Sequence, residues 1–370
     1  MLWTSLLEKH ARLLVDYCIE AKPGWEVVIS AGVEAVPLVY ELVKALASRG
    51  AYPVTMLRDE LLTEAFYKYA SIEALEHEPR IDLRVMEEAN ALINIISPSH
   101  ARPLVGVPAD RVARTYKASA RVHKVFLERS ARGELRWVVT PYPTRALAQE
   151  AGMSFIDFVD FVFKALKLYE EDPVKAWRMQ AEMQERIIEV LSKSDEIKIV
   201  GKGVDLFLKV GGRKWINDDG KYNMPGGEVF TAPIEDSVEG WIEFEYPSLY
   251  SGYEVEGVRL VFRRGVVVEA KAARGDDVLK SILATDEGAK RVGEFAFGLN
   301  YSIDRHTKII LFDEKRGGTL HLALGSAYPE TGGRNVSSVH WDLIKDASRV
   351  EVYADGDLVY SNGRFTILES

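Results

Sequence analysis

The first half of the chain alternates short apolar runs with segments of helical periodicity, and this alternation constrains the fold more than any other feature. The run EVVISAG, at residues 26–32, has the composition of a buried strand, and residues 34–50 follow with helical spacing and a closing glycine. Residues 51–57 and 90–98 repeat the strand pattern, and residues 108–133 predict one long helix. Strands that alternate with helices predict a parallel α/β sheet.

The character of the sequence changes after Ser194, where β-branched and aromatic runs separated by glycine and Asp-Gly turns begin to dominate. A chain of 370 residues, 47% of them hydrophobic, is long enough to bury two cores. We therefore expect an α/β fold in two domains. The first, residues 1–190, is a parallel-sheet α/β domain, and the second, residues 191–370, is a β-rich α+β domain that carries the candidate site described below.

Charge and cysteine content exclude several classes of partner and site. The net charge is -9 and the acidic residues are spread through the chain, which argues against a nucleic-acid partner. The N-terminal segment is interrupted by charges, and no run of about eighteen uncharged apolar residues predicts a membrane span. The single cysteine, Cys18, excludes a disulfide or a cysteine-based metal site within one chain. We expect a cytoplasmic protein, because such cysteine usage fits a reducing compartment.

Familiar nucleotide-binding and hydrolase motifs are missing from the sequence. The first strand-to-helix connection, ISAGVEAVP, has one glycine where a dinucleotide fingerprint has three, and nothing matches a P-loop. The sequence also contains neither a His-Glu-x-x-His helix nor a Gly-x-Ser-x-Gly nucleophile elbow. Any chemistry must therefore come from another arrangement of residues.

Two segments of the second half place a glutamate directly after glycine. In NMPGGEVFTAP, a Pro-Gly-Gly turn leads Glu228 into the start of a strand. In RVGEFAFGLN, Glu294 stands in an apolar context that requires a partner for its charge. Each has an ordinary explanation: Glu228 on an exposed hairpin, and Glu294 in a salt bridge with Arg291.

Two further segments supply histidines. In DEKRGGTLHLALGSAYPETGG, His321 lies on a predicted strand, and the loop after it carries Tyr328. In NVSSVHWDL, His340 and Asp342 point to the same side of a predicted strand because side chains alternate along it. The ordinary explanations are a hydrogen-bonded core histidine for His321 and a simple histidine–aspartate hydrogen bond for the pair.

Together the four segments offer two histidines, two glutamates and one aspartate, all nitrogen and oxygen donors that suit zinc, cobalt or manganese. An open catalytic site takes about three protein ligands for each ion, so five donors with one shared carboxylate suit two ions roughly 3.5–4 Å apart. A closed metal site that only stabilises a binding module is one alternative. A two-metal hydrolase of another bond, an amidase or a phosphoesterase, is the second. The five donors are Glu228, Glu294, His321, His340 and Asp342.

The same four segments resemble, in order and spacing, the signature blocks of the M29 metallo-aminopeptidases, the thermophilic metalloprotease family of aminopeptidases T and S. The N-terminal phrases AKPGWEVVIS and ASRGAYPVTML are also similar to that family, so the likeness covers most of the chain. One departure is Gly226, where the family usually has an aspartate before Gly-Glu. The loss of that charge bears on metal affinity or on recognition of the substrate amine.

The resemblance implies that the five donors bind two divalent ions, zinc or cobalt, with manganese or magnesium as alternatives. It also implies catalytic roles for Tyr328, as a hydrogen-bond donor to the oxyanion, and for Glu228. Glu314, in the third segment, is a weaker candidate for a supporting or base carboxylate. The implied function is metal-dependent aminopeptidase activity on peptides with a free N-terminus, in a homodimer whose β-rich domains enclose the active sites.

Overall fold

The structure is a computed structural model that describes residues 3–250 and 252–368. The chain forms two compact units, residues 1–176 with 220–224 and residues 177–219 with 225–370. We keep the boundary near residue 190 as a prediction about where the chain divides into independently folding domains. Within the described residues, no helix has the length and apolar character that crossing a bilayer requires.

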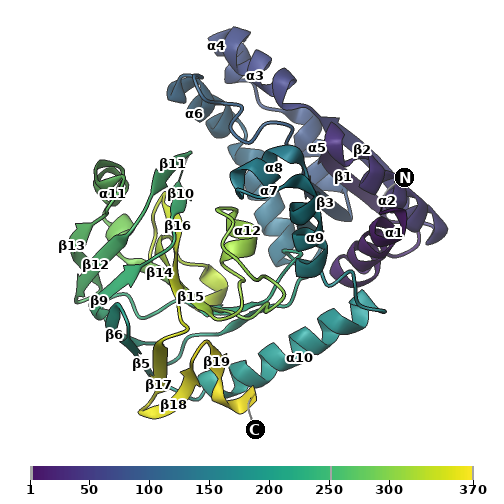
Figure 1. The fold of residues 1–370 in the computed structure, drawn as a ribbon. Helices are drawn as coiled ribbons and strands as arrows, with labels where there is room; N and C mark the ends of the chain where they lie inside the picture. The colour runs from purple at the N-terminus through teal and green to yellow at the C-terminus, as the bar shows by residue number, and fades with distance from the viewer. Residues whose placement is uncertain (1–2, 251, 369–370) are drawn as a thin grey trace. The chain divides into compact units, whose positions relative to one another are not determined.

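The first unit contains the predicted parallel sheet, of which β1, β2 and β3 are labelled in Figure 1. The strand order is β2-β1-β3-β4, and the pairing is parallel throughout. Val27, Val28 and Ile29 are buried in succession, so both faces of the central strand are covered, as is typical of parallel sheets. The α/β prediction for this half is confirmed. The strands are β1 (Glu26–Gly32), β2 (Tyr52–Arg58), β3 (Ala91–Ile96) and β4 (Arg136–Pro141).

Helices follow the strands of this unit in the predicted alternation. The last of them, α10 (Pro173–Leu191), begins in the first unit and continues into the second. The others are α1 (Thr4–Leu13), the π-helical η1 (Leu14–Cys18), the 3-10 helix η2 (Val33–Ala35), α2 (Val36–Ser48), α3 (Glu60–Tyr69), α4 (Ile72–Leu75), α5 (Arg80–Glu88), α6 (Ala109–Ala118), α7 (Ala120–Ala131), α8 (Arg145–Glu150) and α9 (Phe155–Ala165).

The single long helix predicted at residues 108–133 is wrong, because α6 and α7 are separated at Ser119. The Ser119 N–H bonds to the carbonyls of both Thr115 and Tyr116, and its hydroxyl donates to the Thr115 carbonyl. A serine hydroxyl that bonds back to the preceding turn competes with the regular helical pattern. The hydrophobic periodicity on either side gave no sign of this local competition.

The second unit is built on antiparallel strands, as the β-rich composition predicts. One sheet has eight strands in the order β13-β12-β9-β6-β5-β17-β18-β19, and the other has five in the order β16-β15-β14-β8-β7. The eight are β5 (Glu196–Gly201), β6 (Val204–Lys209), β9 (Glu239–Phe244), β12 (Val258–Arg263), β13 (Val266–Lys271), β17 (Val350–Ala354), β18 (Asp357–Ser361) and β19 (Arg364–Phe365). The five are β7 (Ile216–Asp218), β8 (Glu228–Thr231), β14 (Val292–Gly298), β15 (Thr319–Gly325) and β16 (His340–Asp346).

Shorter elements complete this unit. They are the hairpin strands β10 (Ser248–Tyr250) and β11 (Tyr253–Val255), the helices α11 (Asp276–Leu283) and α12 (Ile310–Asp313), and the 3-10 helices η3 (Gly288–Lys290), η4 (Pro329–Thr331) and η5 (Thr366–Leu368).

The five-stranded sheet has one face in the core of the second unit and another face that carries polar side chains. Leu320, Leu322 and Leu324 of β15 belong to the same core cluster as strands of the eight-stranded sheet. Trp341 and Leu343 of β16 belong to it as well. Because side chains alternate along a strand, the residues between them occupy the opposite face. That face is where the candidate site lies.

Candidate metal centre

Four neighbouring strands of the five-stranded sheet bring the predicted donors together. Glu228 begins β8, Glu294 lies in β14, His321 in β15, and His340 and Asp342 in β16. These strands are consecutive neighbours in the order β16-β15-β14-β8. Residues that are more than 110 positions apart in the sequence therefore meet on one face of one sheet.

The Pro-Gly-Gly turn positions Glu228. The Gly227 N–H donates to the Asp218 carbonyl at 2.8 Å, which closes the connection between β7 and β8. Gly227 has a φ of 115°, and a Cβ at this position would lie 2.6 Å from the Cβ of Asn300. Only glycine fits both this backbone conformation and this close approach. The glycine that precedes Glu228 thus serves to place the carboxylate.

A β-bulge directs Glu294. The register of β14 against β15 shifts between Val292 and Glu294, so Gly293 is an extra residue in the strand. A Cβ at Gly293 would lie 2.4 Å from the carbonyl oxygen of Gly325, which leaves no room for a larger residue. Bulges re-aim side chains and are frequent beside active sites.

The donor atoms form two overlapping groups of three, Glu228–Glu294–His321 and Glu294–His340–Asp342. Within each group, the three atoms lie within 4.8 Å of one another. Glu294 belongs to both: its Oε1 is 3.4 Å from His321 Nε2, and its Oε2 is 3.6 Å from His340 Nε2. Glu228 Oε2 is 3.6 Å from His321 Nε2. Asp342 Oδ1 is 3.8 Å from His340 Nε2.

The ring of His340 is oriented by a backbone carbonyl. Its Nδ1 lies 2.9 Å from the Ser326 carbonyl oxygen, which can only accept, so in the neutral ring Nδ1 carries the proton and donates it. The Nε2 lone pair then faces Glu294 and Asp342. Histidines that bind metals commonly have their second nitrogen fixed by such a partner.

Tyr328 lies against this histidine from the loop that follows β15. Its ring makes an edge contact with the ring of His340, with centroids 5.0 Å apart, and lies 5.6 Å from the ring of Phe230. Desolvation of the phenol beside these rings, with the negative charges of Glu294 and Asp342, raises the pKa of Tyr328 well above its usual range, although the residue as a whole is 42% exposed. The phenol therefore keeps its proton and can act as a hydrogen-bond donor.

A fully buried lysine supports Glu228. Lys315 is 0% exposed, and its Nζ lies 3.2 Å from Glu228 Oε1 and 3.2 Å from Asp218 Oδ2. It also pairs with Glu314, which belongs to neither group of three donors. The sequence motifs point to Glu314, but no motif points to Lys315 or Asp218. The only signal for Lys315 was its place directly after Glu314, in the segment that also supplies His321.

Burial makes the charged forms of these groups costly. It raises the pKa of Glu228 and of Glu294 well above the usual value, and that of Asp218 to about 6. Burial lowers the pKa of His340, but the charges of Asp342 and Glu294 outweigh it, so the pKa lies above its usual value. Carboxylates in such surroundings need nearby positive charge to stay ionised.

Three of the ordinary explanations for these side chains are wrong. Glu228 is 5% exposed, so it does not lie on an exposed hairpin. Arg291 donates to the Glu235 carbonyl, and Glu294 faces the two histidines instead. His340 and Asp342 are 3.8 Å apart at their closest nitrogen and oxygen, which is too long for a hydrogen bond.

Unpartnered buried atoms support a fit between this cluster and metal ions. Glu228 Oε2, which faces the cluster, is buried and has no hydrogen-bond partner among residues 3–250 and 252–368. His321 Nδ1 is also buried without a partner among these residues, whereas its Nε2 is the nitrogen that faces Glu228 and Glu294. His321 is therefore not a fully hydrogen-bonded core histidine either. An oxygen and nitrogen donor set without thiolate suits zinc, cobalt or manganese. The side chains of His340 and Asp342 are 29% and 11% exposed, so the cluster is accessible on one side.

Comparison with known proteins gives one consistent result. The family model described as thermophilic metalloprotease (M29) matches residues 4–365. Aminopeptidase T of Thermus thermophilus is 30% identical over 388 residues, which cover 95% of this chain and 95% of that protein. Aminopeptidase 2 of Geobacillus stearothermophilus is 29% identical over 410 residues, which cover 97% and 98% of the two chains.

A solved structure agrees with the sequence matches. The structure of wild-type AmpT from Thermus thermophilus superimposes on this chain with a TM-score of 0.86 at 28% sequence identity. The superposition covers 98% of this chain and all of the other.

Proposed function

Because the chain belongs to the thermophilic metalloprotease (M29) family and is thereby a metallo-aminopeptidase, we propose that it cleaves N-terminal residues from peptides with two bound divalent ions. The observation that supports this proposal most directly is the position of Glu294. Its two carboxylate oxygens face different histidines, so one carboxylate belongs to both groups of donors. We infer that Glu228 and His321 would hold one ion, that His340 and Asp342 would hold the other, and that Glu294 would be a ligand of both.

The charges of the cluster support two ions over one. Asp218, Glu228, Glu294, Glu314 and Asp342 bring five carboxylates into contact with one lysine and two histidines. With neutral histidines and ionised carboxylates, the formal charge is -4, which two divalent cations balance. With a single ion, two of these carboxylates would have to take up protons, because buried charges without a partner are neutralised by a shift in pKa.

Two such ions, when bound, supply polarisation of the scissile carbonyl and a water with a pKa lowered toward about 7. The chain's own residues prepare the site for this chemistry. Lys315 holds Glu228 Oε1, which leaves Oε2 directed at the centre. Ser326 fixes the ring of His340. These fixed contacts reduce the reorganisation that the reaction requires.

We assign to Tyr328 the donation of a hydrogen bond to the oxygen that becomes negatively charged during attack on the peptide carbonyl. Its raised pKa and its contact with His340 support this role, since a phenol that keeps its proton beside the centre can donate where charge develops. The family resemblance assigns a tyrosine to the same task.

The decisive experiment measures release of the first residue from leucyl and alanyl anilides by chelated protein, before and after addition of zinc or cobalt. Chelation should abolish the reaction and either metal should restore it. N-acetylated substrates should be cleaved poorly, because acetylation removes the free amine that an aminopeptidase recognises. Full activity in the metal-free protein, or equal cleavage of acetylated and free substrates, would contradict the proposal.

The same assay separates the alternatives. Turnover of phosphoesters or of blocked amides in place of free peptides would identify a two-metal hydrolase of another bond. Metal binding without any turnover would identify a structural metal site. The accessible side chain of His340 argues against the latter, because structural sites close their coordination sphere. We also propose a cytoplasmic location, which fits a chain whose single cysteine, Cys18, cannot form a disulfide within the chain; a fractionation that recovers the protein outside the cytoplasm would refute it.

A further inference from the structure

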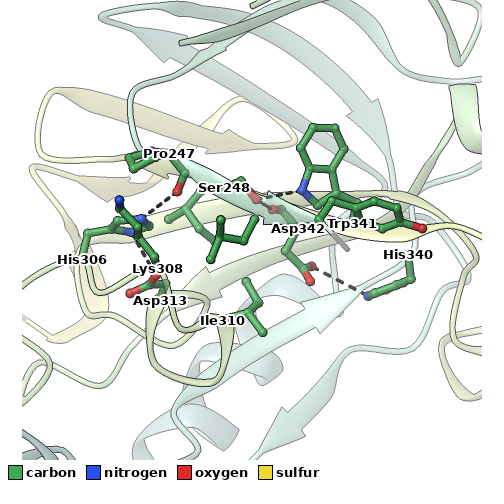
Figure 2. A pocket seen from close by; sticks show the side chains of 12 residues that line it. Pro247, Ser248, His306, Lys308, Ile310, Asp313, His340, Trp341 and Asp342 are labelled. Atoms are coloured by element: carbon green, nitrogen blue, oxygen red, sulfur yellow. Dashed lines mark hydrogen bonds and ion pairs between the residues drawn. The ribbon is translucent and has the colours of Figure 1, made fainter. Parts of the chain in front are cut away.

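A pocket of about 160 Å³ lies beside the donor cluster and shares two residues with it, His340 and Asp342. Figure 2 shows these two side chains at one end and His306 and Asp313 at the other, with Ile310 between them. Any group that fills the pocket therefore touches the same residues that face the ions. Nothing in the proposed chemistry yet uses this space.

The walls of the pocket are mostly apolar. Carbon-rich side chains surround it on several sides, and none of them belongs to the donor groups. They are Leu249, Tyr250, Ile310, Trp341 and Ile344. Such walls favour an apolar occupant, because burial of apolar surface stabilises by about 25 cal/mol per Å².

The charged groups that line the pocket already have partners. Lys308 Nζ is 2.9 Å from Glu254 Oε2. His306 Nε2 donates to the Pro247 carbonyl at 2.8 Å, and its Nδ1 is 3.2 Å from Asp313 Oδ2. Asp313 Oδ1 in turn accepts from the Thr307 N–H at 2.7 Å and from the Thr307 hydroxyl at 2.8 Å. A charged side chain that entered the pocket would lose its hydration without gaining a free partner of opposite charge.

We propose that this pocket binds the side chain of the substrate's N-terminal residue and selects apolar side chains no larger than a benzene ring. This inference rests on the proposed function and adds its substrate class. It assigns specificity to Ile310 and Leu249, which are not metal ligands.

The position of the pocket favours the first residue of the substrate. An exopeptidase holds the scissile carbonyl at its ions, and the side chain of the first residue is two bonds from that carbonyl. The inner wall is formed by the pair of Asp313 and His306, whose side chains are only 2% and 11% exposed. Such a buried end favours a side chain over a continuing peptide chain.

The size of the pocket sets the upper limit. A cavity of about 150 Å³ lined by aliphatic and aromatic side chains binds benzene, and this pocket has about the same volume. Leucine, isoleucine and methionine fit, phenylalanine is at the limit, and the indole of tryptophan is too large. Arginine and glutamate are disfavoured by their charge.

Ile310 offers a test that leaves the fold intact, since it is 45% exposed at the mouth of the pocket. Ile310→Trp fills the pocket and Ile310→Ala enlarges it. Leu358→Trp is the matched control, because Leu358 is 41% exposed in the same unit and does not line the pocket. Metal content and melting temperature of all three variants are compared with those of the wild type.

The measurement is kcat/KM of the metal-loaded enzyme on anilides of alanine, leucine, tryptophan and arginine. The wild type should prefer leucine by about 10-fold or more over tryptophan and arginine. Ile310→Trp should lower kcat/KM on the leucine anilide about 10-fold and change kcat/KM on the alanine anilide less than about 2-fold. Ile310→Ala should raise kcat/KM on the tryptophan anilide relative to that on the leucine anilide. Leu358→Trp should keep the wild-type profile.

Two results would overturn the inference while the proposed function stands. In one, both Ile310 variants cleave all substrates with the wild-type profile. In the other, the effect of Ile310→Trp on the cleavage of dipeptides depends on the side chain of the second residue and not of the first. The pocket would then be a site for the residue after the cleaved bond. Failure of the wild type to cleave any free-amine substrate would instead overturn the proposed function itself.

Discussion

Among single residues, Lys315 has the largest expected influence on the metal centre without being a donor. It holds Glu228 Oε1 at 3.2 Å, while Glu228 Oε2 remains buried and without a hydrogen-bond partner among the described residues. Lys315 therefore determines which oxygen of the Glu228 carboxylate is available to a metal ion. Its positive charge also opposes cation binding, so orientation and repulsion act in opposite directions.

Lys315→Met should weaken metal binding about 10- to 100-fold, because loss of a partner that orients a ligand usually has this effect and exceeds the relief of repulsion. Lys345→Met is the control: Lys345 is also 0% exposed, and it pairs with Glu245 at 2.7 Å. Competition with a chelating dye gives the affinities. Unchanged or tighter binding in Lys315→Met alone would contradict the orienting role.

The sequence motifs predict the five donors, but none of them indicates Lys315. Glu228, Glu294 and the others stand in short segments with glycine, where type and spacing point to chemistry. Lys315 is one lysine in the charged run DEKR, and such runs are usually solvated. Lys315 is buried because the folded chain places it against Asp218 and Glu228, which lie 97 and 87 positions earlier in the sequence. No local sequence pattern indicates such distant contacts.

Tyr328→Phe tests the proposed oxyanion contact. Loss of a donor that acts in the transition state should lower kcat by about 10²- to 10³-fold, with little change in KM or metal content. Tyr253→Phe, at an exposed tyrosine of the same unit, should be neutral. If Tyr328→Phe loses metal instead, the tyrosine supports His340, and if kcat is unchanged it has no part in the reaction.

At the level of elements, one candidate site is formed by residues from scattered sequence segments, because these lie on four adjacent strands, β8, β14, β15 and β16. Alternation along each strand was predictable: Val339, Trp341 and Leu343 face the core, and His340 and Asp342 face the other side. The order of the strands was not predictable, because the packing of the whole unit determines which antiparallel strands become neighbours. The family resemblance supplied the grouping that periodicity alone left open.

Gly227→Ala tests how far the turn before β8 controls the site. An alanine at φ 115° costs on the order of 1–3 kcal/mol, and its Cβ would also collide with Asn300 and displace Glu228. Gly356→Ala is the control, since Gly356 has φ 90° and open space at its Cβ. Both variants should lose thermal stability, but only Gly227→Ala should lose bound metal. Equal metal content in the two would show that the turn does not position Glu228.

For the molecule as a whole, the fold class followed from the sequence because each half has one dominant pattern. The alternation up to β4 specified a parallel sheet, and the β-branched runs after Ser194 specified antiparallel strands. The break at Ser119 was missed because it depends on one hydroxyl and not on hydrophobic periodicity.

The resemblance also predicts a homodimer. Sedimentation equilibrium at micromolar concentration should give twice the chain mass of 41.5 kDa. Mutation of Ile310 should leave this mass unchanged, so that its effects on substrate profile are not effects on assembly. A monomeric mass for active enzyme would remove the enclosed dimer from the prediction.

The central claim, two divalent ions joined by Glu294, is tested most directly by the number of ions bound to each chain. Chelated protein is loaded with zinc or cobalt, freed of excess metal and measured by mass spectrometry of the elements, together with Glu294→Gln and the control Glu287→Gln, whose side chain is 93% exposed. The wild type and the control should bind about two ions, and Glu294→Gln should lose most of both, because the carboxylate belongs to both donor groups. One ion per wild-type chain, or two ions retained by Glu294→Gln, would contradict the account.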